Sequence, residues 1–328
     1  MQHDNGRMTI TTAANRRFAL VTETFAPQIN GVANTLGHLV EGLLQRHYAL
    51  QLIRPAQAGE SLGTHSLGAF SELRVRGRPI PGYPELQWGL PASSRLRRLW
   101  SKERPDAIYL ATEGPLGWAA LRVARRLGIP VISGFHTNFQ QYSDHYGLSL
   151  FHQPMMSYLR WFHNNTLLTL TAGPGQQRAL LRAGMRNLAQ LGRGVDCEQF
   201  HPTHRKIALR AEWQAAEKDL VLLHVGRLAA EKNLSLLVQA WQRLQQSPIP
   251  GGGKLHLVIV GDGPSRTELQ RQLPSAIFTG ALTGEALSAA YASADIFLFP
   301  SVTETFGNVV TEAMASGLAV CAFDLAAA

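Results

Sequence analysis

The chain has 328 residues, of which 45% are hydrophobic and 16% are charged. This composition is typical of a globular protein with room for two domains, and it excludes a disordered chain. No apolar run is as long as a membrane span, and residues 1–16 lack the hydrophobic centre of a signal peptide, so we expect a cytoplasmic protein. The two cysteines, Cys197 and Cys321, form no zinc or redox pattern, which favours buried or incidental thiols.

Charge is unevenly divided along the chain. Residues 1–195 hold 21 Lys and Arg against 10 Asp and Glu, and residues 196–328 hold 10 against 13, so charges of +11 and −3 make up the total of +8. In the densest basic run, residues 95–104, two leucines and Trp100 fall on one helical stripe. We favour packing of this stripe on the protein's own sheet over contact with an anionic membrane. Nucleic acid is not an expected partner, because no reading motif accompanies the charge.

Apolar runs of strand length alternate with amphipathic segments through the first half of the chain. This alternation predicts parallel βα units in a doubly wound sheet. The expected elements are strands at 17–22, 49–54, 107–111, 130–134, 167–171 and 188–192, and helices at 31–45, 115–127, 151–165 and 173–183. Residues 56–91, rich in Gly, Pro and Ser, are too long for a mere connection and indicate either a functional flap or a small irregular hairpin.

The same alternation starts again in the second half. Its expected elements are strands at 220–225, 256–260, 277–280, 294–299 and 318–323, and helices from Leu234, at 283–291 and from Gly307. We therefore predict a flexible N-terminus at 1–16, one Rossmann-like domain at 17–195 and a second at 196–328.

The stretch 301–317, SVTETFGNVVTEAMASG, reads as the end of a strand, a tight loop and a helix start. In parallel sheets ligands gather at such strand ends, where helix N–H groups favour a phosphate. Glu304 lies in the loop and Glu312 about a turn and a half into the helix, so the two carboxylates suit an elongated ligand. Helix capping and a solvated surface position explain these residues from the sequence alone equally well.

Four further residues follow predicted strands. Arg227 and Lys232, in GRLAAEKN, can clamp a diphosphate from two sides, or form an ordinary solvated pair. Gly31 enters a helix directly after a strand, which lets the backbone approach a diphosphate, although a tight turn requires a glycine as well. His136 emerges at the same sheet edge as Gly31, where a structural histidine is the alternative.

These motifs resemble those of the retaining GT-B glycosyltransferases of family 4, and the resemblance extends over nearly the whole chain. The matching segments are ETFAPQINGV at 23–32, FHTNF at 135–139, the linker GRGVDCEQFHP at 192–202, GR and EK at 226–232, GDGP at 261–264 and the Glu-x7-Glu motif at 304–312. The resemblance implies two Rossmann-like, doubly wound domains with an interdomain cleft. Because the family continues with further βα units after the strand at 318–323, we expect a truncated C-terminal domain.

The resemblance also implies a role for each candidate residue. His136, as a positioning group near the reacting carbon, and Glu304, near the sugar hydroxyls, are the expected catalytic residues. The GDGP glycines are expected to be structural. The other implied roles are donor diphosphate binding by Gly31, Arg227 and Lys232, donor sugar binding by the amides of Phe306, Gly307, Asn308 and Val309, and ribose binding by Glu312.

We therefore predict a retaining hexosyltransferase that moves a hexosyl group, mannose first, from GDP-mannose or a UDP-hexose to a lipid, glycan or small-molecule hydroxyl. No Asp-x-Asp pair occurs in the sequence, so we expect neither a metal nor a cofactor beyond the substrate. A non-catalytic sugar-nucleotide-binding fragment and a sugar-nucleotide epimerase are the alternatives. A lipid-linked acceptor would place the protein peripherally on the inner face of an anionic membrane.

Overall fold

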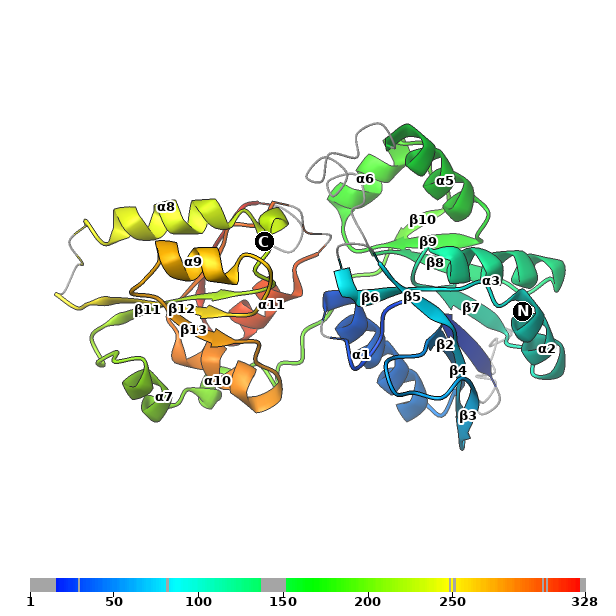
Figure 1. The fold of residues 1–328 in the computed structure, drawn as a ribbon, viewed down its shortest axis with the longest axis horizontal. Coiled ribbons are helices and arrows are strands. Elements are labelled where there is room, and N and C mark those ends of the chain that lie inside the picture. The colour runs from blue at the N-terminus through cyan, green and yellow to red at the C-terminus, as the bar shows by residue number, and fades with distance from the viewer. Residues whose placement is uncertain are drawn as a thin grey trace, which may run out of the picture. The chain divides into compact units, whose positions relative to one another are not determined.

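The computed structural model describes residues 16–28, 30–80, 83–136, 152–247, 249, 252–302, 304 and 306–324. The chain divides into two compact units, one built on an eight-stranded sheet and the other on a five-stranded sheet (Figure 1). We call them the N-terminal unit, with most of the chain up to residue 189, and the C-terminal unit, chiefly residues 190–324.

The N-terminal unit contains the predicted strands and helices and adds four strands. Its strands are β1 (Arg17–Val21), β2 (Ala49–Pro55), β3 (Gly63–Leu67), β4 (Phe70–Val75), β5 (Gly77–Ile80), β6 (Tyr83–Gly89), β7 (Ala107–Leu110), β8 (Val131–Phe135), β9 (Leu168–Thr171) and β10 (Leu188–Gln190). Its helices are α1 (Gly31–Gln45), α2 (Ser93–Lys102), α3 (Pro115–Arg126) and most of α5 (His152–Asn164), whereas most of α6 (Pro174–Arg182) belongs to the C-terminal unit. The large sheet has the order β10-β9-β8-β7-β1-β2-β4-β3.

Alternate side chains of β1 enter two different cores, as expected for a sheet that is covered on both faces. Ala19 and Val21 pack in one cluster with buried residues of α2, α3 and α5, whereas Leu20 packs in another with Leu36 and Val40 of α1. The sheet is therefore doubly wound, with α1 on one face and α2, α3 and α5 on the other.

The basic helix α2 packs on its own sheet, as favoured from the sequence. Leu96 and Trp100 are buried in the same cluster as α3, while Arg95, Arg97 and Arg98 are exposed. Because Leu96 and Trp100 are taken up by the core, the side chains that α2 exposes to another partner are polar and mainly cationic.

The segment 56–91 contains two antiparallel strand pairs, where the sequence predicted either a functional flap or a single small hairpin. β3 and β4 pair antiparallel, and β4 extends the main sheet by pairing parallel to β2. β5 and β6 form a separate two-stranded ribbon. Glu72 of β4 is buried, and Nε of the buried Arg54 on β2 donates to its carboxylate at 2.6 Å. Charged residues at these buried positions concealed the strand pattern in the sequence.

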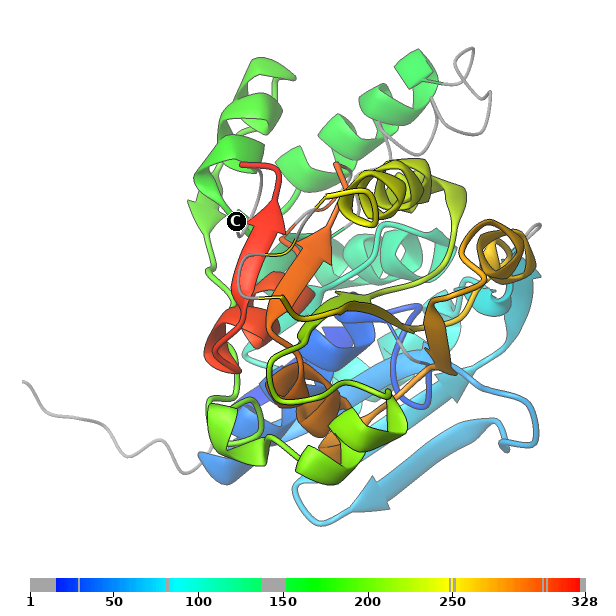
Figure 2. The ribbon, with the colours of Figure 1, turned by 90° about the vertical axis from the view of Figure 1, so that its left-hand side faces the viewer.

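The C-terminal unit is a smaller doubly wound sheet of order β13-β12-β11-β14-β15. Its strands are β11 (Leu220–Val225), β12 (Leu255–Val260), β13 (Ile277–Gly280), β14 (Ile296–Phe299) and β15 (Ala319–Ala322). Its helices are η2 (Pro202–His204), α7 (Ile207–Glu212), η3 (Ala230–Lys232), α8 (Leu234–Leu244), α9 (Arg266–Gln272), α10 (Gly284–Ser293) and α11 (Asn308–Ala315). Residues of α8 and α9 fill one core cluster, and residues of α10 and α11 fill the other, on the opposite side of the sheet (Figure 2).

Each sheet changes winding direction beside its first strand. β1 pairs with β2 on one side and with β7 on the other, and β11 pairs with β12 and β14 in the same way. In doubly wound sheets ligands bind beyond the carboxyl ends of the strands at such a switch point. The residues that follow β1, β7, β11 and β14 are therefore the first places to look for a site.

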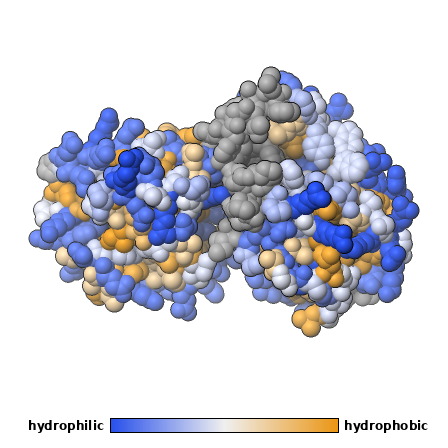
Figure 3. Space-filling view, in the orientation of Figure 1, coloured by the Kyte–Doolittle hydropathy of each residue, from blue (hydrophilic) through white to orange (hydrophobic). Residues whose placement is uncertain are grey.

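The visible surface is mainly hydrophilic, with hydrophobic residues scattered over it (Figure 3). Within the described ranges, no helix is both long enough and apolar enough to cross a membrane. Cys197 and Cys321 are free and exposed, so of the two alternatives expected, buried or incidental thiols, the buried one is wrong. Cys321 is exposed because it lies on β15, an edge strand of the five-stranded sheet.

Candidate active site

The switch point of the C-terminal unit carries an ion pair between two of the predicted site residues. Lys232, the last residue of η3, contacts the Glu304 carboxylate through its ammonium group, and both side chains are mostly buried. The hydroxyl of Ser301 donates to the same carboxylate oxygen at 2.9 Å. The structure thus brings together a cation and a carboxylate that the sequence had assigned to different parts of a ligand.

Asn233 ties the Lys232 segment to the neighbouring strand end. It adopts a left-handed conformation, with φ of 53°, and its side chain donates to the carbonyl of Pro300 at 3.1 Å. A left-handed residue here turns the chain sharply from η3 into α8. Lys232 is therefore held on a fixed turn.

The loop that carries Arg227 lies directly against the GDGP turn. A Cβ on Gly261 would be 1.9 Å from the carbonyl oxygen of Gly226, and one on Gly263 would be 2.4 Å from that of Leu228. Only glycine permits this close backbone approach. The two glycines are structural, as the sequence suggested, and they fix the loop that contains Arg227.

The loop before α11 contains the residues predicted to face the donor sugar. Gly307 stands at the N-cap of α11 with φ of 85°, a conformation that favours glycine, and it offers no side chain to cap the helix. Arg193, from the linker, donates to Asn308 at 3.3 Å and lies 5.7 Å above the ring of Phe306. The helix N-terminus that begins at Asn308 and Val309 is thus braced by a linker arginine that sequence reasoning did not single out.

Glu312 is held by a buried tyrosine. The hydroxyl of Tyr291, on α10, donates to the Glu312 carboxylate at 2.9 Å. Burial, with the Glu312 charge, raises the pKa of Tyr291 well above its usual range, so Tyr291 remains a donor at neutral pH. This contact fixes one carboxylate oxygen of Glu312.

His224, on β11, is completely buried, and the charges of the Lys232–Glu304 ion pair act on it. Its Nδ1 lies 3.0 Å from the carbonyl oxygen of Leu298, so Nδ1–H donates and Nε2 carries the lone pair. Within the described part of the chain, Nε2 has no hydrogen-bond partner. Burial lowers the pKa of His224 to about 4, and the charge of Lys232 acts in the same direction. The imidazole is therefore neutral at neutral pH.

In the N-terminal unit, Gly31 begins α1 directly after its cap. The side-chain oxygen of Asn30 accepts from the backbone N–H of Val32 at 3.1 Å and of Ala33 at 2.9 Å. This capping arrangement orients the first turn of α1 at the carboxyl edge of the sheet. Gly31 therefore stands where the sequence placed it.

His136 follows β8 and is held by a tyrosine from the neighbouring strand. The hydroxyl of Tyr109, on β7, lies 2.6 Å from Nε2 of His136. A Cβ on Gly134 would be 2.1 Å from that hydroxyl and 2.4 Å from Nε2. The glycine thus makes room for the hydrogen bond that fixes the His136 ring.

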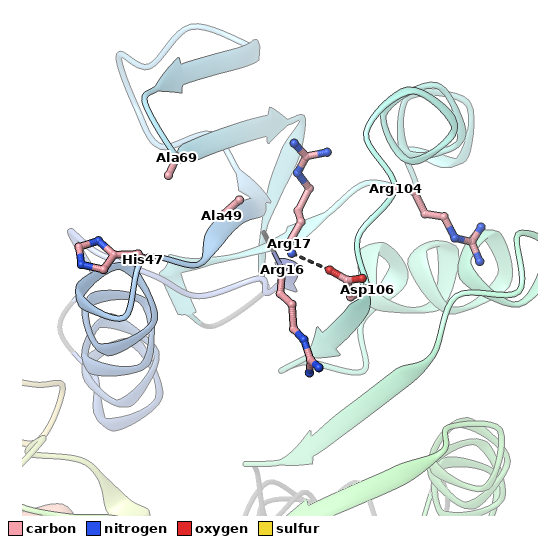
Figure 4. A pocket seen from close by; sticks show the side chains of 7 residues that line it. All are labelled: Arg16, Arg17, His47, Ala49, Ala69, Arg104 and Asp106. Carbon is pink, nitrogen blue, oxygen red and sulfur yellow. Dashed lines mark hydrogen bonds between the residues drawn. The ribbon is translucent and has the colours of Figure 1, made fainter. Parts of the chain in front are cut away.

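A hollow of about 410 Å³ lies elsewhere, at the amino ends of β1 and β2. Figure 4 shows that the side chains of Arg16 and Arg17 point in opposite directions and that the backbone of Arg17 meets Asp106. Arg104 is engaged with the carbonyl oxygens of Leu127 and Gly128. Because these groups diverge, and because they lie at the opposite sheet edge from Gly31, this hollow is not the candidate active site.

Two family models match the chain, Glycosyltransferase Family 4 over residues 29–199 and glycosyl transferases group 1 over residues 219–328. The chain belongs to glycosyltransferase family 4. A GDP-mannose-dependent alpha-mannosyltransferase of Mycobacterium tuberculosis is 35% identical over 309 residues, which cover 94% of this chain and 79% of the relative. One of Corynebacterium glutamicum is 36% identical over 303 residues, which cover 92% of this chain and 71% of the relative.

Solved structures show that this family 4 chain has the GT-B fold that the sequence predicted. Sucrose-phosphate synthase from Thermosynechococcus elongatus aligns with a TM-score of 0.74 at 17% identity, covering 95% of this chain and 82% of that one. Anabaena Alr3699/HepE, in complex with UDP and glucose, aligns with a TM-score of 0.69 at 18% identity, covering 94% and 81%.

Proposed function

We propose that this family 4 enzyme transfers a mannosyl group, with retention, from GDP-mannose to a hydroxyl acceptor. The observation that carries the proposal is the Lys232–Glu304 ion pair at the switch point of the C-terminal unit, beside the glycine-capped start of α11. Transfer from a nucleotide sugar needs stabilisation of the charge that grows on the departing diphosphate, which a lysine and a helix N-terminus supply. The choice of GDP-mannose rests on the relatives, which bear that donor in their names.

The roles of the candidate residues follow from this chemistry. Lys232 and Arg227 would bind the diphosphate, and the amides of residues 306–309 would hold the sugar and its phosphate. Glu304 would face the sugar hydroxyls, and Glu312 would accept the ribose hydroxyls. Of the candidate residues in the N-terminal unit, Gly31 would bind the diphosphate, and His136 would position the reacting end of the sugar.

In the ion pair, Lys232 and Glu304 neutralise each other, which limits the cost of burying either charge. An arriving diphosphate would compete with Glu304 for Lys232, and the sugar hydroxyls would take over the carboxylate. Neither residue then remains as an isolated buried charge during the exchange.

The acceptor is proposed to be lipid-linked, at an anionic membrane on the cytoplasmic side. The exposed Arg95, Arg97 and Arg98 of α2 suit electrostatic contact with such a surface, since the apolar stripe of α2 is buried. A further relative, of Mycobacterium tuberculosis, is named as a phosphatidylinositol dimannoside mannosyltransferase. Flotation with anionic and neutral vesicles tests the contact, which is wrong if the protein floats with neither.

Calorimetry with GDP, UDP and ADP, followed by transfer assays with the matching sugar nucleotides, tests the donor. We expect GDP to bind and mannose to be transferred, and we expect Glu312→Ala to weaken GDP binding by about tenfold through loss of the ribose contact. Asp324→Ala, a surface carboxylate after β15, is the matched control and should bind like the parent chain. Stronger binding of UDP would overturn the donor assignment, and hydrolysis or epimerisation without an acceptor would overturn the transfer.

A further inference from the structure

A second carboxyl group stands at the switch point of the N-terminal unit, where no role has been assigned. Glu23 follows β1, and only 8% of it is exposed. Its backbone N–H donates to the hydroxyl of Thr112 at 3.0 Å, and its side-chain Oε1 accepts from the backbone N–H of Leu116 at 3.0 Å. A backbone hydrogen bond from Gly89, the last residue of β6, reaches the same carboxyl group. Glu23 therefore joins three separate segments of the chain.

The start of α3 is shaped to receive this carboxyl group. The N-cap residue of α3, Gly114, provides no side-chain cap, and the N–H of Leu116 in the first turn is satisfied by Glu23 instead. A Cβ on Gly114 would be 1.8 Å from Oε2 of Glu23. The glycine thus leaves the space that the carboxyl group fills, and Glu23 caps α3 from a distant part of the chain.

Thr24, which directly follows Glu23 in the chain, begins a short series of side-chain hydrogen bonds that reaches the first turn of α1. The next residue, Thr24, accepts at its hydroxyl from the amide of Asn30 at 2.7 Å. Asn30 in turn caps α1 by accepting from the backbone N–H groups of Val32 and Ala33. The orientation of these N–H groups, beside Gly31, is thereby linked to the place where Glu23 is anchored.

The surroundings of Glu23 disfavour a charge on it. Burial raises the pKa of Glu23 to about 7, and the neighbouring Glu113 carboxylate adds to the increase. Glu113 itself lies 3.1 Å from Nε2 of the buried His163, and its backbone carbonyl accepts from Tyr158. Burial raises the pKa of Tyr158, and its interactions with Glu113 and Glu23 add to the increase. Among the described residues, Glu113 and Tyr158 are therefore the titratable groups that interact electrostatically with Glu23, and His163 contacts Glu113.

We propose that Glu23 is a positioning residue, which anchors the end of β1 on the start of α3 and on the end of β6 and so orients the first-turn N–H groups of α1 toward a diphosphate. The proposal rests on the proposed function, since it gives those N–H groups a ligand. The neutral carboxyl group fits the anchored position. Ionisation adds a buried charge next to Glu113, which the N–H donors of Leu116 and Gly89 offset only in part, so we expect it to weaken the anchoring of the loop.

Hydrogen–deuterium exchange tests the anchoring without any ligand. Glu23→Ala should speed exchange at the amides of Val32 and Ala33, because it removes the anchor of the loop that holds their cap. Asp219→Asn, which changes a buried carboxylate before β11, is the matched control and should leave these amides unchanged. If Glu23→Ala does not fold, Thr24→Val cuts the same series one step later. Unchanged exchange at both amides in a folded variant would overturn the proposal.

The affinity for GDP as a function of pH separates positioning from mere stability. The dissociation constant of the parent chain should rise about tenfold as the pH passes through the pKa of Glu23, whereas Glu23→Gln, which cannot ionise, should show no such rise. Ionisation of GDP itself affects both proteins alike. Identical pH profiles would overturn the proposal. Failure of the folded parent chain to bind any nucleotide would instead overturn the proposed function, and the exchange experiment would still decide the anchoring.

Discussion

The two sheets bury titratable groups of opposite kinds at their switch points. The N-terminal unit holds the carboxyl group of Glu23 after β1, with the pKa raised to about 7 from 4.5. The C-terminal unit holds the imidazole of His224 on β11, with the pKa lowered to about 4 from 6.5. Burial favours the neutral form in both cases, but the neutral form is the protonated one for Glu23 and the deprotonated one for His224.

The two units should therefore respond to pH in opposite directions. Between pH 4.5 and 7 the unfolded chain loses the Glu23 proton while the folded chain keeps it, so the free energy of unfolding falls as the pH rises. Between pH 6.5 and 4 the unfolded chain binds a proton at His224 that the folded chain does not bind. The free energy of unfolding therefore falls as the pH drops through this range. The comparison teaches that each sheet buries one neutral titratable group near its switch point, and that the charged pair beside His224 is the one that we propose to exchange with a ligand.

The largest effect is expected from Lys232→Met, which removes the cation from that pair. Mannosyl transfer should fall about 100- to 1,000-fold, as for loss of one preorganised charge-stabilising group. The pKa of His224 should rise, because the Lys232 charge holds it down. Steady-state kinetics measures the first effect. Lys254→Met, which changes an exposed lysine before β12, is the control, and equal activity of the two variants would contradict the assigned role.

Glu23→Gln should remove the pH response of the N-terminal unit. The parent chain should lose up to about 3 kcal/mol of unfolding free energy between about pH 4.5 and pH 7, and the glutamine variant should not. Urea unfolding, followed by hydrogen exchange in the N-terminal unit at several pH values, measures the difference. Parallel curves for the two proteins would mean that Glu23 is ionised in the folded state.

His224→Asn should remove the opposite response from the C-terminal unit. An asparagine amide can replace Nδ1–H as donor to the carbonyl of Leu298 but cannot take up a proton. The loss of unfolding free energy between pH 6.5 and 4, up to about 3 kcal/mol in the parent chain, should shrink. Hydrogen exchange in residues 220–225 at those pH values measures this loss. If the free energy of unfolding of the variant falls between pH 6.5 and 4 as it does in the parent chain, the assignment to His224 is wrong.

Tyr109→Phe should lower kcat by about fivefold while the chain stays folded. The variant loses only the hydroxyl that holds Nε2 of His136, and a hydrogen bond of this kind contributes about 1 kcal/mol. Its melting curve and its KM for GDP-mannose should match those of the parent chain. A wild-type kcat would show that the orientation of His136 does not limit the reaction.

Tyr291→Phe is expected to have the smallest effect. Glu312 loses one fixed hydrogen bond but keeps its place on α11, so KM for the donor should rise about two- to fivefold at constant kcat. Tyr158→Phe in the N-terminal unit, which also removes a buried hydroxyl, is the matched control for stability. A fall in kcat instead would place Glu312 closer to the reacting atoms than we propose.

The sequence allowed prediction of the C-terminal candidate site better than of the network around Glu23. Lys232 and Glu304 are 72 residues apart, but each closely follows a recognisable strand, and the strands of a doubly wound sheet deliver such residues to one edge. Glu23 and Leu116 are 93 residues apart, and nothing in the pattern of either segment marks a side chain that caps a distant helix. Tyr109 was missed for the same reason, because its partner His136 is 27 residues away on another strand.

Strand pairing in the segment 56–91 was also beyond the sequence. Arg54 and Glu72 occupy buried positions where a periodic pattern predicts apolar residues. Their ion pair offsets the cost of burying the two charges. By contrast, α1 has the predicted bounds, Gly31–Gln45, because its capping asparagine and its apolar face agree.

Gly307 gives α11 an N-terminus that the chain itself does not cap with the side chain of its N-cap residue. If a bound phosphate accepts from the first N–H groups of α11, it stabilises the folded C-terminal unit by an amount that grows with the logarithm of the donor concentration once this exceeds the dissociation constant. The enzyme would then be longest-lived where its donor is most abundant. A cell that runs short of the nucleotide sugar would lose the protein to proteolysis as well as losing the reaction.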